Sequence, residues 1–347
     1  MKKDIIKRSY FFSKNSKTVM ILSLMLIFML TFAGCAKDGK EEANSETQEQ
    51  TDSADAEKTV YVVAKDGSGD FTTIHEALAN IPASYDKRIK IFIKNGTYDE
   101  DLITISEMKN NLTLEGESRD GVLITRAEGV PNSNTVNVTM EVNAQNFVAV
   151  NLTIENRVPY SNAVKVSGDK AIFKNCCLVG GQDTLYLSKD GARQYFEDCI
   201  IKGYTDFIYG PSTAVFKNCE IITYRRSGYI TAASTNPGNK YGLIFMNCNI
   251  KSESSEYKTH LGRPWRQGAA VVFMNCYLGD HVLTEGWTDM HENKAELARF
   301  YEYKNTGPGA VINEKRRQLT DEEAKEYTPE KIFKNSKDTW DPLTVEY

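Results

Sequence analysis

Two aspartates in the middle of the chain are the strongest candidates for chemistry. Asp183 lies in GGQDTLYL (180–187) and Asp206 in GYTDFIYG (203–210), each followed by apolar residues. A strand interior normally excludes Asp, because burying an unpaired carboxylate is costly. Two carboxylates in unlike environments can act as an acid/base and a nucleophile, so this pair predicts such a site. The alternative at this point is two unrelated aspartates in turns.

A third motif, HLGRPW (260–265), supplies groups that would complete such a site. Arg263 can keep a buried carboxylate ionised through a two-pronged ion pair, and Trp265 offers the flat apolar face on which a sugar ring stacks. Taken alone, a surface arginine and a core tryptophan remain the commoner interpretations.

A repeat in the sequence indicates how these residues are positioned. Each unit reads apolar, Phe, any residue, Asn or Asp, Cys, any residue, then Ile or Leu, and the Phe positions lie 20 to 29 residues apart. The units are IFKNCCL (172–178), YFEDCII (195–201), VFKNCEI (215–221), IFMNCNI (244–250) and VFMNCYL (272–278). Units this short cannot bury their own apolar face, so they must stack on one another.

The composition of the units predicts strands without intervening helices, and therefore an all-β, right-handed parallel β-helix. An antiparallel sandwich is the alternative, but it would not explain identical residues in one register. Asp183 and Asp206 are separated by the same 23 residues as Phe173 and Phe196, so we expect the two carboxylates to stack on one side. The recurrent Asn or Asp of each unit is expected at a bend, bonded to neighbouring backbone.

The cysteines of the repeat have a structural interpretation. The register predicts a buried column of small apolar side chains formed by Cys176, Cys199, Cys219, Cys248 and Cys276. Neighbouring turns are close enough for a Cys199–Cys219 disulfide in an oxidising compartment, which stays open as an alternative. Their spacings match no zinc motif.

Helices are expected at both ends of the coil. TTIHEALANIP (72–82) offers Thr73 as N-cap with Glu76 three residues later, and would cover the open end of the coil. LTDEEAKEYTPEKIF (319–333) repeats the device with Thr320 and Glu323, and should pack on the outside as one closing helix.

The N-terminus differs from the rest of the chain. Residues 1–35 combine a basic start, an apolar run and FAGC, typical of a bacterial lipoprotein signal in which Cys35 is lipidated; a cleaved signal or an uncleaved anchor are the alternatives. Residues 36–58 are polar and acidic and predict a flexible tether to a domain over 59–347. The leader carries about +5, so the remainder of the −5 chain carries about −10. An acidic exported body argues against nucleic acid, and we expect a monomer attached to a membrane only by lipid.

Taken together, the motifs closely resemble the pectin methylesterases of the pectinesterase family. The resemblance runs from about residue 60 to 343 and includes VAKDGSGDFTTIHEAL, GGQDTLY, GYTDFIYG, HLGRPW, EGW (285–287) and YEYKNTGPGA (301–310). It implies a right-handed parallel β-helix and hydrolysis of the methyl esters of pectin to pectate and methanol. It implies no metal and no organic cofactor.

The resemblance assigns the site residue by residue. Asp206 would be the nucleophile, Asp183 the general acid and then base, and Gln182 a donor to the oxyanion. Arg263 would pair with Asp206 and keep it charged. Asp183 should start protonated, its pKa raised by burial and by the charge of Asp206.

Other residues would bind substrate. Trp265, Tyr186 and Phe207 are expected to line the sugar groove, although a regular strand would not point both Asp206 and Phe207 there, so we expect a local bend at Asp206. The family commonly has Gln where this chain has Asn162 in NAVKV, so the donor there would stop about 1.5 Å short. We expect Asn162 at substrate, with a weakened role.

Three functions remain to be distinguished. The first is a pectinesterase acting on methyl-esterified pectin. A pectate lyase or polygalacturonase on the same fold is the second, although a lyase would need more carboxylates for Ca²⁺ than this set provides. The third is a surface protein that binds pectin without turnover, which only Asn162 favours.

Overall fold

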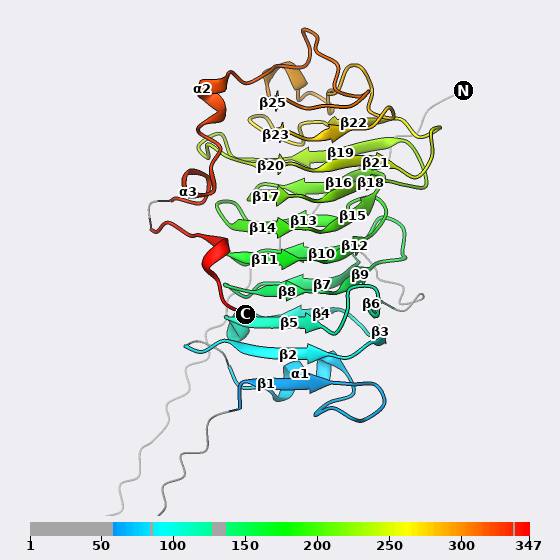
Figure 1. The fold of residues 1–347 in the computed structure, drawn as a ribbon, viewed down its shortest axis with the longest axis vertical. Coiled ribbons are helices and arrows are strands. Elements are labelled where there is room, and N and C mark those ends of the chain that lie inside the picture. The colour runs from blue at the N-terminus through cyan, green and yellow to red at the C-terminus, as the bar shows by residue number, and fades with distance from the viewer. Residues whose placement is uncertain (1–57, 84–85, 127–136, 336) are drawn as a thin grey trace, which may run out of the picture. The chain divides into compact units, whose positions relative to one another are not determined.

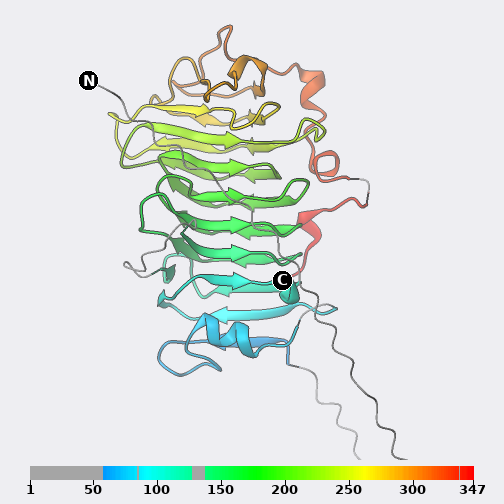
Figure 2. The ribbon, with the colours of Figure 1, turned by 180° about the vertical axis from the view of Figure 1, so that it is seen from behind.

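Three parallel sheets lie side by side along the coil of a β-helix, and most turns of the chain add one strand to each of them (Figures 1 and 2). The computed structural model describes residues 58–83, 86–126, 137–335 and 337–347. All pairings between strands of the three sheets are parallel, which confirms the predicted parallel β-helix.

The three sheets are built from short strands. The ten-stranded sheet contains β1 (Val60–Val63), β2 (Ile89–Ile93), β5 (Leu112–Gly116), β8 (Val148–Val150), β11 (Ala171–Lys174), β14 (Arg193–Glu197), β17 (Thr213–Lys217), β20 (Leu243–Met246), β23 (Ala270–Met274) and β25 (Arg299–Tyr303). The seven-stranded sheet contains β4 (Ile103–Ile105), β7 (Val138–Val142), β10 (Asn162–Val166), β13 (Leu185–Leu187), β16 (Thr205–Gly210), β19 (Gly228–Ala233) and β22 (Thr259–Gly262). The eight-stranded sheet contains β3 (Gly96–Asp99), β6 (Val122–Thr125), β9 (Thr153–Glu155), β12 (Cys177–Val179), β15 (Ile200–Gly203), β18 (Glu220–Thr223), β21 (Asn249–Ser252) and β24 (Tyr277–Leu278).

The repeated phenylalanines form one ladder through the core. Phe173, Phe196 and Phe216 are register partners on β11, β14 and β17, and Phe245 and Phe273 continue the column. Successive rings stack with centroids 4.9, 4.7, 4.6 and 4.3 Å apart. Each such pair contributes about 1 kcal/mol beyond the burial of its apolar area. The sequence repeat therefore fixes the register of neighbouring turns.

The Asn or Asp of each unit turns the chain from the ten-stranded to the eight-stranded sheet. These corner residues adopt positive φ, a conformation that Asn and Asp tolerate better than other side chains do. They are Asn151 (φ 55°), Asn175 (49°), Asp198 (55°), Asn218 (54°), Asn247 (55°) and Asn275 (52°). The expected bend is confirmed, but the Asn175 amide donates to the Asn151 side chain at 2.8 Å rather than to backbone.

The five cysteines of the repeat are buried free thiols, which confirms the expected column; the alternative Cys199–Cys219 disulfide is not formed in this structure. Each thiol contacts backbone of a neighbouring turn, as Cys199 Sγ does at 3.3 Å from the carbonyl of Phe173. Their role in the fold is packing.

The N-terminal helix is confirmed. Helix α1 (Ile74–Asn80) begins after Thr73, whose hydroxyl accepts from the Glu76 backbone N–H at 3.1 Å. It buries Ile74, Ala77 and Leu78 in the core at the β1 end of the coil (Figure 1). A 3₁₀ turn, η1 (Glu107–Lys109), lies farther along the chain.

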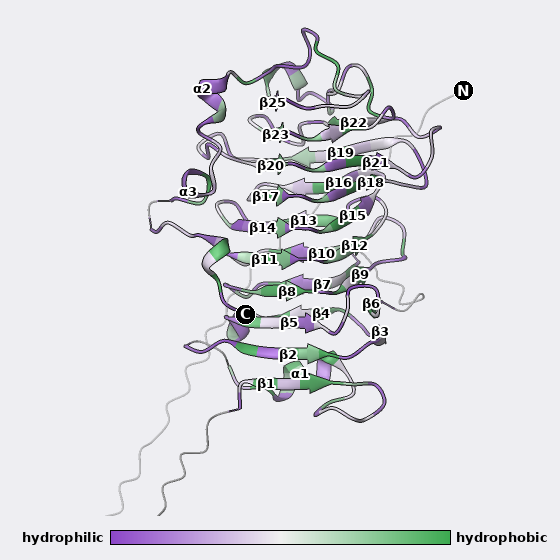
Figure 3. Ribbon diagram, viewed as in Figure 1, coloured by the Kyte–Doolittle hydropathy of each residue, from purple (hydrophilic) through white to green (hydrophobic). Residues whose placement is uncertain are grey.

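The single closing helix predicted over 319–333 is wrong, because the segment forms two short helices. Helix α2 (Asp321–Ala324) has the expected capping box of Thr320 and Glu323, and its ribbon in Figure 3 is coloured mainly as hydrophilic. Helix α3 (Pro329–Ile332) begins at Pro329, which disfavours helical backbone in the residue before it and so separates the two. Two further 3₁₀ turns, η2 (Ala295–Leu297) and η3 (Pro342–Thr344), complete the helices of the described residues.

The C-terminal segment packs on the outside of the ten-stranded sheet, as expected (Figure 2). Phe333 and Trp340 pack with Tyr195 of β14. Arg193 of the same strand donates to the carbonyl of Phe333 at 2.8 Å and pairs with Asp338 at 2.5 Å. The segment therefore covers apolar side chains on the outer face of this sheet.

The expected signal peptide (1–35), with Cys35, and nearly all of the expected tether (36–58) lie outside the described residues. Within the described part of the chain, no helix is long and apolar enough to cross a membrane.

Candidate active site

Asp206 occupies a break in strand β16. Its φ is +51°, and the pairing of β16 with β19 shifts register between Thr205 and Ile208. Only 5% of its surface is exposed. The bend expected at this residue is therefore present, and it holds a carboxylate where a regular strand would not.

Arg263 holds this carboxylate in the expected two-pronged ion pair. Its Nε donates to Oδ1 of Asp206 at 2.9 Å and its Nη2 to Oδ2 at 2.7 Å, and the side chains are 21% and 7% exposed. The guanidinium also lies over the ring of Tyr229, 3.9 Å from its centroid. A fork of this kind supplies two charge-assisted hydrogen bonds to a carboxylate that is almost fully buried.

The strand before Arg263 ends at a glycine for a steric reason. A Cβ on Gly262 would lie 1.9 Å from Oγ1 of Thr231 on the neighbouring strand β19. The close approach brings β22 against β19, and the backbone N–H of Arg263 donates to the Thr231 carbonyl at 3.0 Å. Because the following residue is Pro264, the chain direction is also restricted here.

Asp183 lies one turn away, before β13, and it also has positive φ (65°). Its backbone N–H donates to the carbonyl of Thr205 at 3.0 Å, so the two aspartates are stacked as the spacing predicts. Burial raises the pKa of Asp183 to about 7; the charge of Asp206 adds to the shift, and Arg263 opposes it. A carboxyl that is protonated near neutral pH thus lies beside a salt-bridged carboxylate.

Gln182, the residue before this carboxyl, is half-buried. Its backbone forms a parallel β-bridge with Thr205, and its side-chain amide makes no hydrogen bond with the described residues. The amide can therefore serve an incoming oxygen, and its assignment as an oxyanion donor stays a prediction.

Three aromatic rings form a wall beside the carboxylates. Tyr186 stacks on Tyr209 with centroids 4.4 Å apart and planes 2° apart. Trp265 meets both rings edge-on, at 6.3 Å from Tyr186 and 5.8 Å from Tyr209. Trp265 and Tyr186 are half-buried, so a part of each ring is exposed, and their role in sugar binding stays a prediction.

The expectation that Phe207 lines the groove is wrong, because Phe207 is fully buried in the core. The left-handed residue at 206 breaks the two-residue alternation, so that Phe207 and Ile208 both point inward and Tyr209 outward. Sequence reasoning missed Tyr209, although its 23-residue spacing from Tyr186 equals that of the two aspartates.

The expectation that Asn162 contacts substrate is also wrong, because this side chain is fully buried. Its Nδ2 donates to the backbone carbonyl of Asp183 and, at 3.0 Å, to the hydroxyl of Tyr209. Asn162 therefore lies behind the site and positions groups that face it.

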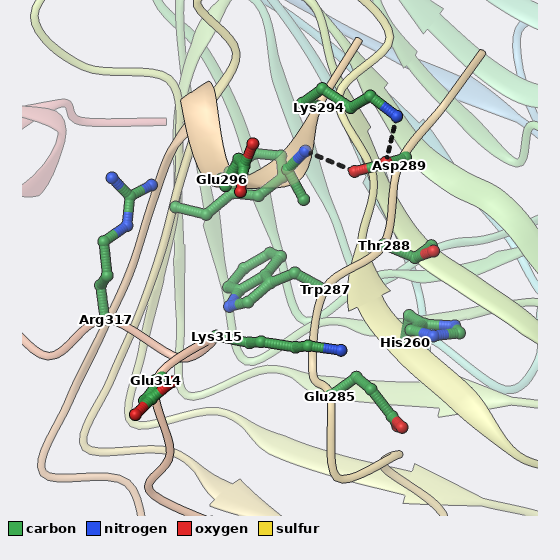
Figure 4. A pocket seen from close by; sticks show the side chains of 12 residues that line it. His260, Glu285, Trp287, Thr288, Asp289, Lys294, Glu296, Glu314, Lys315 and Arg317 are labelled. Atoms are coloured by element: carbon green, nitrogen blue, oxygen red, sulfur yellow. Dashed lines mark hydrogen bonds and ion pairs between the residues drawn. The ribbon is translucent and has the colours of Figure 1, made fainter. Parts of the chain in front are cut away.

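A separate pocket of about 620 Å³ lies near the last turns of the coil (Figure 4). Trp287 and a Lys294–Asp289 ion pair at 2.8 Å are among its lining. His260 also lines it and stacks on Tyr229 with centroids 5.5 Å apart, which connects the pocket to the Arg263 side of the site. Neither aspartate of the candidate site lines this pocket.

Comparisons with known proteins identify the family and the fold. A family model described as Pectinesterase matches residues 60–336. Pectinesterase A of Dickeya chrysanthemi is 36% identical over 345 residues, covering 81% of this chain and 92% of that protein. A crystal structure of a pectin methylesterase in complex with a hexasaccharide has a TM-score of 0.73 and 36% identity, covering 82% of this chain and 98% of that one.

Plant relatives are similar over a part of their length. The probable pectinesterase/pectinesterase inhibitor 42 of Arabidopsis thaliana is 37% identical over 268 residues, which are 73% of this chain and 51% of that protein. The chain thus spans about half the length of this relative. With residues 60–336 matched by the family model and the fold shared with solved members, the chain belongs to the pectinesterase family.

Proposed function

We propose that this protein hydrolyses the methyl esters of galacturonate units in pectin, giving pectate and methanol. The observation that carries the proposal is the pair of unlike carboxyl groups. Asp206 is held by two hydrogen bonds from Arg263, while the pKa of Asp183 is raised to about 7 by burial and by Asp206. A nucleophile and a proton donor are thus ready at the same pH.

In the first step, the Asp206 carboxylate attacks the ester carbonyl carbon and the carbonyl oxygen becomes an oxyanion. The free amide of Gln182 donates to that oxygen. As the tetrahedral intermediate collapses, the carboxyl of Asp183 gives its proton to the leaving methoxide, which departs as methanol. The product of this step is an anhydride between Asp206 and the galacturonate unit.

In the second step, the Asp183 carboxylate takes a proton from water, which attacks the galacturonyl carbonyl of the anhydride. Collapse releases the galacturonic acid unit, which loses its proton to solvent, and restores the Asp206 carboxylate, with Arg263 again as its partner and Asp183 protonated again. The cycle needs only the groups that the two turns and the Arg263 motif supply. Trp265, Tyr186 and Tyr209 provide apolar ring faces for the sugars on either side.

One assay separates the proposal from its alternatives. Highly methylated pectin is incubated with the full chain, and methanol and new reducing or unsaturated ends are measured in the same sample. The esterase releases methanol without new ends. New ends without methanol would instead identify a polygalacturonase or lyase, and binding without either product would identify a non-catalytic pectin-binding protein.

We also propose that the protein is exported and tethered to the bacterial surface through a lipid on Cys35, as a monomer. The basic, apolar and FAGC segments of the leader support this, followed by the acidic stretch 36–58. Detergent phase partitioning of the wild type and of Cys35→Ala tests it. The wild type should enter the detergent phase and the variant should not; equal partitioning would contradict lipidation.

A further inference from the structure

The short amide of Asn162 is connected to the groove through a second side chain. An asparagine at this place stops about 1.5 Å earlier than a glutamine would. Its Nδ2 lies 3.0 Å from the hydroxyl oxygen of Tyr209, to which it donates. The same Nδ2 donates to the carbonyl of Asp183, so the amide is fixed between a catalytic turn and the aromatic wall.

The hydroxyl of Tyr209 has one hydrogen left to give. A phenol can accept and donate at once, and here its oxygen accepts from Asn162. Among the described residues, the hydroxyl of Tyr209 donates its own hydrogen to no acceptor. An accepted bond also polarises the O–H group, which strengthens the bond that the phenol can donate.

The ring of Tyr209 is held by its neighbours, and its hydroxyl shares the Asn162 amide with the backbone carbonyl of Asp183. It is 8% exposed, stacked on Tyr186 and packed against the edge of Trp265. Burial raises the pKa of Tyr209 above its usual value, and the negative charges of Asp183 and Asp206 add to the shift, so the phenol stays protonated. It is thus a neutral donor throughout the pH range in which Asp183 titrates.

We propose that the Tyr209 hydroxyl, positioned by Asn162, is a second hydrogen-bond donor to the ester carbonyl oxygen as that oxygen becomes the oxyanion, beside Gln182. Tyr209 is then a catalytic residue and Asn162 a positioning residue. The inference rests on the proposed esterase activity and deepens it.

The first test is Tyr209→Phe in the full chain, assayed for methanol release from methylated pectin. A donor used only in the transition state lowers kcat and leaves KM nearly unchanged, so we expect a loss of about 10²-fold in kcat. Tyr195→Phe is the matched control, because it removes another nearly buried phenol, 2% exposed and bonded to Glu197 at 3.1 Å, on the ten-stranded sheet. Its kcat should equal that of the wild type.

The second test is a rescue. In the Tyr209→Phe background, the hydroxyl that accepts from residue 162 is absent. Asn162→Gln then lengthens the side chain by one methylene, so that its amide can itself donate to the substrate. We expect the double variant to recover at least about tenfold in kcat over Tyr209→Phe, the equivalent of one weak donor regained. If the hydroxyl of Tyr209 had only a structural role, a longer amide at residue 162 would not restore kcat, because it would not replace the packing that was lost.

The third test is coupling. If Asn162 acts through Tyr209, then Asn162→Ala and Tyr209→Phe should be non-additive, and the double variant should be no slower than the slower single one. Three results would each overturn the inference: a wild-type kcat in Tyr209→Phe, a loss confined to KM, or a folded rescue variant no faster than Tyr209→Phe. Additive losses would also overturn it. A wild type that releases no methanol would instead refute the proposed function.

Discussion

Asp198 and Asp206 are eight positions apart in the sequence and have nearly the same backbone conformation, with φ of 55° and 51°. Asp198 lies at a corner of the coil, is exposed, and has Asn175 and Asn218 as its equivalents on adjacent turns. Asp206 is 5% exposed and bonded twice to Arg263. The left-handed conformation is thus a property of the coil, whereas the chemistry comes from what surrounds the side chain.

The column of Asn and Asp residues at the corners and the stacked pair of Asp183 and Asp206 also differ in what their stacking does. At the corners, Asn and Asp interchange from turn to turn because a short polar side chain is all that the bend requires. At the site, a second carboxyl, Asp183, is partly buried and stacked next to a negative charge; burial and then this charge raise its pKa to about 7. One architecture therefore yields a structural ladder on one edge and the proposed acid and nucleophile on another.

Asn substitutions of Asp206 and of Asp198 should show the largest difference in activity between the site and the corners. Asp206→Asn removes the nucleophile and should lower methanol release by at least about 10⁴-fold, as loss of a nucleophile does in other covalent hydrolases. Asp198→Asn only copies the Asn of adjacent corners, so its activity should stay within about twofold of wild type. Equal losses in both variants, measured by initial methanol release, would mean that the effect comes from the fold.

Removing the proton donor should have the next largest effect. Asp183→Asn should lower kcat/KM by about 10²–10⁴-fold at pH 6, the usual contribution of a general acid. The wild type should lose activity about tenfold per pH unit above a pKa of about 7, because acylation needs the protonated carboxyl. In the variant this decline should be absent; a decline that persists would assign it to another group.

The core ladder should respond in stability and leave the chemistry alone. Phe216→Ala removes a fully buried ring stacked between Phe196 and Phe245, and should lower the free energy of unfolding by about 3–5 kcal/mol. Below its melting range, the variant should retain the wild-type KM. Denaturant unfolding checks the first part, and a large change in KM of the folded variant would show that the ladder also shapes the groove.

The stacked pair of Asp183 and Asp206 should instead reduce the free energy of unfolding in a pH-dependent way. Because the folded pKa of Asp183 exceeds the value of 3.8 expected when unfolded, the folded chain binds more protons between these values and loses stability as pH rises through them. Asp183→Asn should therefore stabilise the protein at pH 8 by up to about 4 kcal/mol, less any loss of its own packing, and by little at pH 4. A destabilised variant at pH 8 would contradict this sign.

Much of this difference between the corners and the candidate site could be predicted from the sequence, because the repeat determines which residues stack. The spacing of Asp183 and Asp206 and the partner Arg263 were read correctly, since stacking in a coil depends on interval alone. Phe207 was misplaced because one left-handed residue shifts the inward and outward alternation of a strand. Asn162 was misplaced because its contacts depend on Tyr209, which reaches it from a strand two positions away in the sheet.

The prediction of one C-terminal helix over 319–333 is wrong for a local reason that is visible in the sequence. Pro329 disfavours helical backbone at Thr328, so the capping signal at Thr320 could start a helix but not continue it to residue 333.

The most direct test of the central claim is a titration of the Asp183 carboxyl by ¹³C NMR, in protein labelled at aspartate and assigned through Asp183→Asn. We predict an apparent pKa of about 7 in the wild type. In Asp206→Asn the value should fall, because the neighbouring negative charge is gone and Arg263 remains. A wild-type pKa near 4, or a value that does not move in Asp206→Asn, would contradict the account that stacking makes these two aspartates chemically unlike.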